Sequence, residues 1–399
     1  MPFRPPASAR VSSIGEPPVA SVMKRFRELR ASGRDVISMA QATPWFGPPP
    51  SAIAALEARL GDPEIHRYGP DEGLESSRTA LAVDLLSRRG IEVDPFTELH
   101  LTCGASQAFL GALAAVADPG DRVVLVEPWY FDHEYAARLL SLDVTAVRAR
   151  ETSGGWRLPL DEALRKVADA SAIVLVSPGN PTGSVIPDSE IEDISNACDR
   201  WGCSLLIDET YERFDFTGTA GHPWARGKPP HVLTFGSFSK SLGISGWRLG
   251  YLFGDRKILA ECLKVQDASV ICPPTAPQVM MEAAIGDAGW AGAAAAGIRT
   301  RMEACRDASA GARGLEWRGV DGGFFTLAAT PGMSSAEVCD ALLERYGIAA
   351  IPGSAFGPAG ESHVRLSFGC LSDLDLEKAC ERLASVDLWG GQRASGSRP

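Results

Sequence analysis

Between residues 98 and 253, the sequence alternates short apolar runs with amphipathic helical patterns, and this alternation restricts the fold more than any other feature. Seven apolar runs are typical of strands, namely ELHLTC, RVVLVE, DVTAVRA, AIVLVS, CSLLID, HVLTF and WRLGYLF. Strands that are apolar on both faces and separated by helices form a largely parallel sheet with helices on both sides. We therefore predict an α/β fold with a mainly parallel seven-stranded sheet, and a ligand at the carboxyl ends of its strands.

The segments on either side of this region predict a second, smaller α+β unit. Helical patterns occupy residues 17–32, 288–312, 334–346 and 372–386, and a further helix is expected from Ser51, as N-cap, through Leu60. The short runs WRGV, GFFTLAA, IAAI and HVRLSF are predicted strands. The predicted organisation is an N-terminal arm and part of the small domain (1–50), a large domain (51–285), a small C-terminal domain (286–390) and a disordered tail (391–399).

Charge and cysteine content exclude several classes of function. The net charge of −11 disfavours a nucleic-acid or anionic-membrane partner, because both need a basic surface. No apolar run reaches the roughly 18 residues that span a bilayer, and the N-terminus lacks the apolar core of a secretory signal. The nine cysteines are scattered without a CxxC pair, so we expect reduced thiols, no metal site and a cytoplasmic location.

One lysine, Lys240, stands among Ser, Gly and Phe residues in the stretch SFSKSLGISGWRLGY. Ser237 lies three residues before it and Arg248 eight residues after it. Such an amine can condense with an aldehyde as a Schiff base, while the hydroxyl and the guanidinium can hold a phosphate. The alternative for Lys240 is an ordinary solvated lysine in a flexible loop.

Polar residues also stand where predicted strands end. The turn Gly104-Ala105-Ser106 opens a helix, whose N-terminus is an anion site, although small residues there also allow close packing. Asp208 follows three apolar residues, and a carboxylate so placed needs a partner unless it is a helix N-cap. Arg365 alternates with apolar residues in HVRLSF and needs a carboxylate, supplied by a ligand or by a structural salt bridge.

The order of these features resembles the class I/II aminotransferase family, the fold-type I pyridoxal phosphate enzymes. The resemblance rests on S-x-S-K-x(7)-R, on SPGNPTG after the fourth run, and on a Y-x-x-x-x-G-x-x-x-x-R segment from Tyr68. It runs from Tyr68 to Arg365. It implies a pyridoxal 5'-phosphate site made of Gly104, Ala105, Ser106, Tyr130, Asn180, Asp208, Tyr211, Ser237, Lys240, Arg248 and Tyr68.

The resemblance also implies a role for individual residues. Lys240 would hold the cofactor as a Schiff base and act as general base and acid. Asp208 would pair with the pyridine nitrogen, and Tyr211 would share the phenolic oxygen with Asn180. Tyr130 would lie flat against the pyridine ring of the cofactor. It is chosen over Trp129 in PWYFDHEY by its position after Pro128, although a role as a core aromatic explains Tyr130 equally well.

On the substrate side, the resemblance implies that Arg365 binds the α-carboxylate together with Asn180. Ala42 and Trp45 border the substrate in the segment QATPWFGPP, where many members carry a glycine at the position of Ala42. Ser106 occupies a position where some aspartate-using members carry a lysine. The resemblance further implies that Tyr68 reaches the cofactor phosphate of a partner subunit, which predicts a homodimer.

The predicted function is transfer of an amino group between an L-amino acid, preferably apolar, aromatic or specialised, and a 2-oxo acid. The same residues serve β-elimination, cyclisation or oxidation of an amino acid, and the sequence does not separate these outcomes. A non-catalytic, aminotransferase-like regulator is disfavoured because the chain has no room or basic composition for a DNA-binding module. A nicotinamide dehydrogenase is disfavoured because no G-x-G-x-x-G follows a strand.

Overall fold

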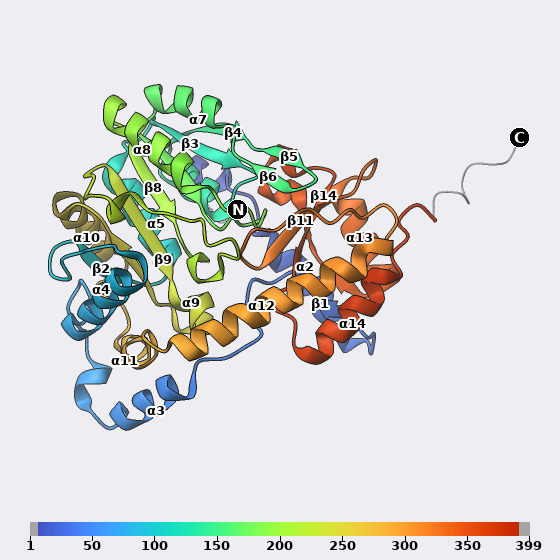
Figure 1. Cartoon of the computed structure of the whole chain (residues 1–399), viewed down its shortest axis with the longest axis horizontal. Coiled ribbons are helices and arrows are strands. Elements are labelled where there is room, and N and C mark those ends of the chain that lie inside the picture. The colour runs from blue at the N-terminus through green and yellow to red at the C-terminus, as the bar shows by residue number, and fades with distance from the viewer. Residues whose placement is uncertain (1–6, 391–399) are drawn as a thin grey trace, which may run out of the picture.

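The computed structural model of the chain describes residues 7–390, so residues 1–6 and the predicted tail at 391–399 lie outside the described residues. Two units lie side by side, and the long helix α12 (Ala288–Ala308) runs from one to the other (Figure 1). No helix among the described residues is both long and apolar enough to cross a membrane.

The larger unit is built on a seven-stranded sheet. In spatial order its strands are β2 (Leu99–Thr102), β10 (Gly250–Phe253), β9 (Val232–Ser237), β8 (Ser204–Asp208), β7 (Ala172–Val176), β3 (Arg122–Glu127) and β4 (Asp143–Arg148). Strand β10 is antiparallel to both its neighbours, and all other pairs in β9–β4 are parallel. The α/β fold with a mainly parallel seven-stranded sheet is confirmed.

Helices cover both faces of this sheet because alternate strand residues point to opposite sides. In β8, Leu206 packs into the cluster that contains Phe109, whereas Leu205 and Ile207 pack into a second cluster. The first face carries α5 (Ala105–Val116), α6 (Phe131–Leu139) and α10 (Arg256–Val270). The second carries α3 (Pro50–Arg59), α4 (Glu75–Arg89), α7 (Leu160–Lys166), α8 (Asp188–Trp201) and α11 (Thr275–Ala284).

The smaller unit contains a three-stranded antiparallel sheet, β11 (Phe325–Ala329), β14 (His363–Ser367) and β13 (Ile351–Pro352), and a parallel pair, β1 (Ile37–Ser38) and β12 (Ile348–Ala349). Its helices are α2 (Pro18–Ala31), α13 (Ser335–Tyr346) and α14 (Asp373–Ala384), together with α12.

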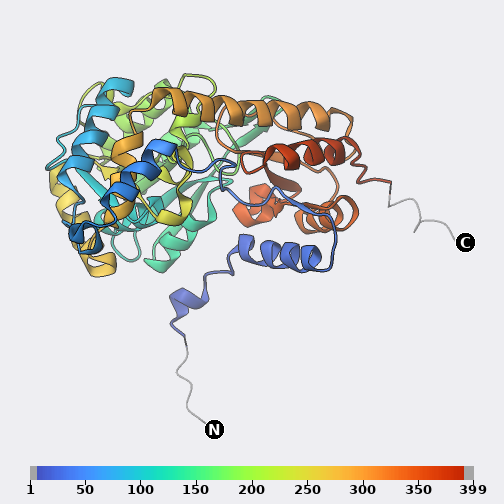
Figure 2. The same cartoon turned by 90° about the horizontal axis from the view of Figure 1, so that it is seen from below.

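The N-terminal segment joins the C-terminal unit, because β1 pairs with β12. In Figure 2 the blue helix α2 lies beside that unit, and α1 (Ala9–Ser12) leads away from it. We propose that the two units are the predicted domains, with boundaries near residues 50 and 285.

Two local predictions are wrong. The run WRGV at 317–320 is not a strand; it packs against a hairpin that was not predicted, β5 (Arg150–Thr152) and β6 (Gly155–Arg157). A Cβ at Gly319 would stand 2.5 Å from the carbonyl oxygen of Gly154, and Arg318 pairs with Glu151 at 2.5 Å, so this segment is held by contacts across the two units.

The predicted N-cap Ser51 is the other correction. Helix α3 begins one residue earlier, at Pro50, with Pro49 as its N-cap. Proline is tolerated at the first helical position because its fixed φ suits the helix and its missing N–H has no partner there.

Candidate active site

A cavity of about 200 Å³ lies at the carboxyl ends of β7, β8 and β9, where they face the smaller unit. Residues from both units line it, and most of the residues predicted from the sequence come together there. Those in its lining are Ala42, Ala105, Ser106, Tyr130, Asn180, Asp208, Tyr211, Ser237, Lys240, Arg248 and Arg365.

Lys240 reaches the cavity from α9 (Phe238–Ser241), a single helical turn that follows β9 directly. Ser237 caps this turn: its Oγ accepts a hydrogen bond from the Ser239 backbone N–H at 3.1 Å and donates one to Ser239 Oγ at 2.8 Å. Burial, with the guanidinium groups of Arg248 and Arg365 nearby, lowers the pKa of Lys240 from 10.5 to about 8. A larger share of the amine is therefore neutral, and nucleophilic, near neutral pH than in an exposed lysine.

This lowered pKa predicts how the reactivity of Lys240 depends on pH. The neutral amine is the form that attacks an aldehyde, so the rate at which the apoprotein takes up pyridoxal phosphate is expected to rise with pH and to reach half its plateau near about 8. Stopped-flow absorbance over a pH series measures this rate. A half-point near 10.5, the ordinary lysine value, would show that burial does not act on this amine.

The other end of the cavity is arranged for an anion. Gly104 precedes α5 with φ of 83°, and a Cβ there would stand 2.7 Å from the Arg248 guanidinium, so a side chain at 104 is excluded. This close approach brings Arg248, the N-terminus of α5 and the hydroxyls of Ser106 and Ser237 to one place. No described carboxylate pairs with Arg248, whose Nη1 donates to the Ser245 carbonyl at 3.0 Å. A phosphate group fits these donors.

Asp208 ends β8 and is buried in the cavity wall, 6% exposed. Its Oδ1 accepts a hydrogen bond from the Thr210 backbone N–H at 2.9 Å, and its Oδ2 lies 3.2 Å from His133 Nε2. The predicted alternative, a helix N-cap, does not hold, because the next helical turn starts at Glu212 with Tyr211 as its N-cap. Asp208 is therefore a buried carboxylate that faces a cavity, as a ring-nitrogen partner would be.

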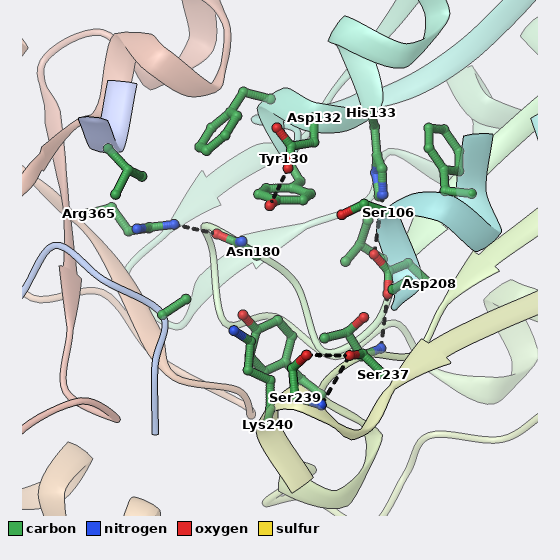
Figure 3. A pocket seen from close by; sticks show the side chains of 18 of the residues that line it. Ser106, Tyr130, Asp132, His133, Asn180, Asp208, Ser237, Ser239, Lys240 and Arg365 are labelled. Atoms are coloured by element: carbon green, nitrogen blue, oxygen red, sulfur yellow. Dashed lines mark hydrogen bonds and ion pairs between the residues drawn. The ribbon is translucent and has the colours of Figure 1, made fainter. Parts of the chain in front are cut away.

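His133 is one of several cavity residues that sequence reasoning missed. It lies in the first turns of α6, three residues after Tyr130, and its ring packs against Phe109 with centroids 4.2 Å apart. Figure 3 shows its imidazole pointing at Asp208. Its position in PWYFDHEY was visible, but only the fold shows that this helix faces the end of β8.

Arg365 is buried on β14, 1% exposed, and makes no ion pair with any described residue. Its Nη1 donates to Asn180 Oδ1 at 2.9 Å (Figure 3). Its Nη2 donates to the Ala40 carbonyl at 2.5 Å, and its Nε has no partner among the described residues. The guanidinium carbon lies 4.4 Å from the Phe325 ring centroid and 5.0 Å from that of Phe356. Burial lowers its pKa to about 10. The structural salt bridge, which was the alternative for Arg365, is absent among the described residues, so this buried cation has no counter-ion there.

The two tyrosines of the cavity remain protonated. Burial raises the pKa of Tyr211, whose ring packs edge-on against Phe324 and Phe325. Burial also raises the pKa of Tyr130, and its hydroxyl donates to Asp132 Oδ2 at 2.6 Å. The Tyr211 hydroxyl is therefore available as a hydrogen-bond donor and not as a base, whereas the Tyr130 hydroxyl already donates to Asp132.

Three predicted residues do not line the cavity of the single chain. Trp45 is 38% exposed, and the Arg301 guanidinium lies 3.8 Å above its ring, so its side chain packs on the smaller unit. Tyr68 is 79% exposed. Gly104 is not in the lining either, and its lack of a side chain leaves room for the Arg248 guanidinium.

The donor set fits pyridoxal phosphate. A buried amine with a lowered pKa suits its aldehyde, the anion site suits its phosphate, and the buried carboxylate of Asp208 suits its protonated ring nitrogen. The unpartnered Nε of Arg365 adds a place for the carboxylate of an amino acid in the same cavity.

Comparison with known proteins gives the same family. The family model "Aminotransferase class I and II" matches residues 34–383. The aromatic aminotransferase ISS1 of Arabidopsis thaliana is 30% identical, over 91% of this chain and 92% of its own length. The aspartate/prephenate aminotransferase of Thermus thermophilus is 30% identical, over 95% of this chain and 98% of its own.

A solved structure agrees. The aspartate aminotransferase from Thermus thermophilus with maleate superposes with a TM-score of 0.88, at 27% identity, over 96% of this chain and 99% of that one. The chain therefore belongs to the class I and II aminotransferases, and it is a pyridoxal phosphate-dependent aminotransferase that moves an amino group between an amino acid and a 2-oxo acid.

Proposed function

We propose that this aminotransferase takes its amino group from an apolar, aromatic or specialised L-amino acid in preference to a dicarboxylic one. The observation that carries the proposal is that Arg365, which has no carboxylate partner in the described chain, lines the same cavity as Lys240. One unpaired guanidinium suits one α-carboxylate. Ser106, at the position where the resemblance places a lysine in some aspartate-using members, contributes a hydroxyl to the cavity and no cation. The relatives named above act, by their names, on aromatic amino acids or on aspartate and prephenate.

The cofactor would be held by residues of the larger unit. Lys240 would hold its aldehyde carbon; Ser106, Ser237, Arg248 and the turn at 104–105 would hold its phosphate. When bound, pyridoxal phosphate supplies an electron sink for the negative charge that develops at the substrate α-carbon.

Other polar groups of the cavity would orient its ring. Asp208, held by His133, would balance the charge of the ring nitrogen. Asn180 and the Tyr211 hydroxyl would reach the phenolic oxygen, and the ring of Tyr130 would cover one face.

Three side chains, those of Arg365, Asn180 and Lys240, would act on the substrate itself. Arg365 and Asn180, already joined at 2.9 Å, would bind the α-carboxylate and so orient the α-hydrogen. Lys240, with its pKa lowered to about 8, would take the α-proton and return it one position away. The burial of these groups keeps water away from the reacting atoms.

The separate roles of Arg248 and Arg365 predict that alanine at the first lowers cofactor affinity and alanine at the second lowers activity on amino acids. Arg248→Ala is expected to weaken pyridoxal phosphate binding by about a hundredfold, because charge-assisted hydrogen bonds to the phosphate are lost. Arg365→Ala is expected to leave cofactor affinity within a few-fold and to lower kcat/KM for amino acids by about a hundredfold. Absorbance titration of the apoprotein and steady-state kinetics measure the two quantities. If Arg365→Ala removes the cofactor and leaves substrate affinity unchanged, the assignment is wrong.

The visible spectrum of the holoenzyme tests the reaction itself, with amino acids added one at a time. A yellow colour that bleaches with an amino acid and returns with a 2-oxo acid is the result expected for transamination, and it identifies the donor. A colour that persists while ammonia, or a product other than a 2-oxo acid, accumulates would instead indicate β-elimination, oxidation or cyclisation.

We also propose a homodimer whose partner contributes Tyr68 to the cofactor phosphate. The exposure of Tyr68, with large apolar side chains such as Ile53, Leu60 and Trp247 also exposed, supports a covered surface. Sedimentation analysis measures the oligomeric state, and a fully active monomer would contradict the proposal.

We propose a cytoplasmic location as well, supported by nine cysteines that form no disulfide.

A further inference from the structure

A second carboxylate, which the proposed roles do not use, faces the same cavity. Asp132 lies in the first turn of α6, two residues after Tyr130, and lines the cavity together with Val19 and Phe131. Figure 3 shows its side chain beside the Tyr130 hydroxyl, to which a dashed line joins it. Because Asp132 and Arg365 line one cavity of about 200 Å³, an amino acid held by Arg365 would place its side chain within reach of Asp132.

The contacts of Asp132 leave acceptor capacity unused. Its Oδ2 accepts one hydrogen bond, from Tyr130 at 2.6 Å. Within residues 7–390, no group donates to Oδ1 and no lysine, arginine or histidine forms an ion pair with Asp132. The carboxylate of Asp208 differs, because a backbone N–H and His133 hold both of its oxygens. An ionised carboxylate has about four acceptor positions, so Asp132 can receive a donor from a ligand.

The positive charges of the cavity are already committed elsewhere. Arg248 is at the phosphate end, Lys240 at the reacting carbon, and Arg365 at the α-carboxylate. A distal carboxylate on the substrate would therefore find no free cation in the described lining and would face Asp132. Two like charges in a partly desolvated cavity repel each other strongly, whereas a donor to a carboxylate makes a charge-assisted hydrogen bond.

We propose that Asp132 selects the amino donor by its side chain. It favours an L-amino acid whose side chain carries a hydrogen-bond donor, such as a phenol, an indole, an amide or an ammonium group, and it rejects an acidic side chain. This inference rests on the proposed function, because it uses Arg365 as the anchor of the α-carboxylate. Asp132 is therefore a specificity residue and takes no part in the proton transfer.

Two pairs of substrates of nearly equal size test the inference. Tyrosine differs from phenylalanine by one hydroxyl, and glutamine differs from glutamate by an amide in place of a carboxylate. We expect the wild-type holoenzyme to prefer the donor-bearing member of each pair by about tenfold or more in kcat/KM. Each ratio compares two substrates on one preparation, so incomplete folding or cofactor loading of a variant cancels.

Substitutions at Asp132 are expected to change these ratios in different ways. Asp132→Asn keeps the size and an acceptor for Tyr130 but removes the charge, so the preference for glutamine over glutamate is expected to fall to about twofold or less. Asp132→Leu removes the acceptor as well and is expected to abolish both preferences. In the matched control, Tyr130→Phe, the carboxylate remains and both preferences are expected to persist. Preferences that persist in Asp132→Leu, or that disappear only in Tyr130→Phe, would overturn the inference.

Calorimetric binding to the holoenzyme separates this inference from the proposed function. The probes are 3-(4-hydroxyphenyl)propanoate and 3-phenylpropanoate, which lack the amino group and do not react. We expect the wild type, but not Asp132→Leu, to bind the hydroxylated acid more tightly by about fivefold or more. Discrimination in binding with no transamination would contradict the proposed function and support the selectivity. Transamination with no discrimination in either measurement would contradict the selectivity alone.

Discussion

Replacing Lys240 with alanine is expected to abolish transamination. The change removes the only lysine amine that lines the cavity in the described chain, and with it the proposed attachment point of the cofactor aldehyde and the proposed carrier of the α-proton. Loss of a positioned general base alone costs about a hundredfold to ten-thousandfold in rate, and the covalent attachment adds to this. We therefore expect kcat/KM to fall by at least about ten-thousandfold.

The measurement combines kinetics with mass spectrometry. After borohydride reduction, the wild-type peptide that contains Lys240 is expected to carry the mass of the cofactor, and the peptide from Lys240→Ala is not. Lys257→Ala, on the exposed first turn of α10, is the matched control and is expected to retain full activity. Lys240→Arg tests whether positive charge alone suffices, and we expect it to be as inactive as the alanine variant. Activity of Lys240→Ala within about tenfold of the wild type would refute the role of this amine.

Asp208→Asn is expected to cause the second largest loss. The amide keeps the shape of the carboxylate and an acceptor for the Thr210 N–H, but it cannot balance a positive charge on the ring nitrogen. Removing one partner of a buried charge pair costs about 3–5 kcal/mol, so a fall in kcat of about a thousandfold is expected. Single-turnover kinetics with the cofactor at saturation measure this loss apart from any weakening of cofactor binding.

The matched comparison for Asp208→Asn is a substitution of His133, the residue that contacts the Asp208 carboxylate. It contacts Asp208 at 3.2 Å and orients that carboxylate without reaching the anion site itself. His133→Asn is therefore expected to lower kcat by about tenfold to a hundredfold, less than Asp208→Asn, and to do so with an unchanged thermal midpoint. A loss in His133→Asn as large as in Asp208→Asn would show that the histidine, and not the carboxylate, carries the interaction with the ring.

Local sequence patterns predicted the larger unit well because its strands are short, apolar on both faces and separated by helices. Asp208 ends β8, and Asn180 and Lys240 follow the carboxyl ends of the neighbouring parallel strands β7 and β9, so the convergence of the three side chains follows from the order of elements. The strand WRGV was predicted wrongly because its alternation resembles a strand, whereas its glycine and its arginine serve a contact with the hairpin of the other unit.

The contacts of the substrate side depend on distances that no local pattern contains. Arg365 and Asn180 stand 185 positions apart in the chain, and the sequence left a ligand carboxylate or a structural salt bridge as the partner of the guanidinium. Among the described residues the guanidinium contacts an amide, a carbonyl and two aromatic rings, so the structural salt bridge is absent and the ligand carboxylate stays a prediction. Trp45 stands three residues after Ala42, yet only Ala42 lines the cavity, because the indole packs beneath Arg301.

The amino-acid sequence by itself determined the fold class, the order of the strands along the chain and the residue types needed by the cofactor, because these follow from apolar periodicity and from motifs within about ten residues. Only the tertiary structure decided that His133 contacts Asp208, that Arg365 lacks a counter-ion among the described residues and that Asp132 lines the cavity. The physical reason is that periodicity reports which face of an element is buried, whereas side-chain partners depend on how separate elements pack against each other.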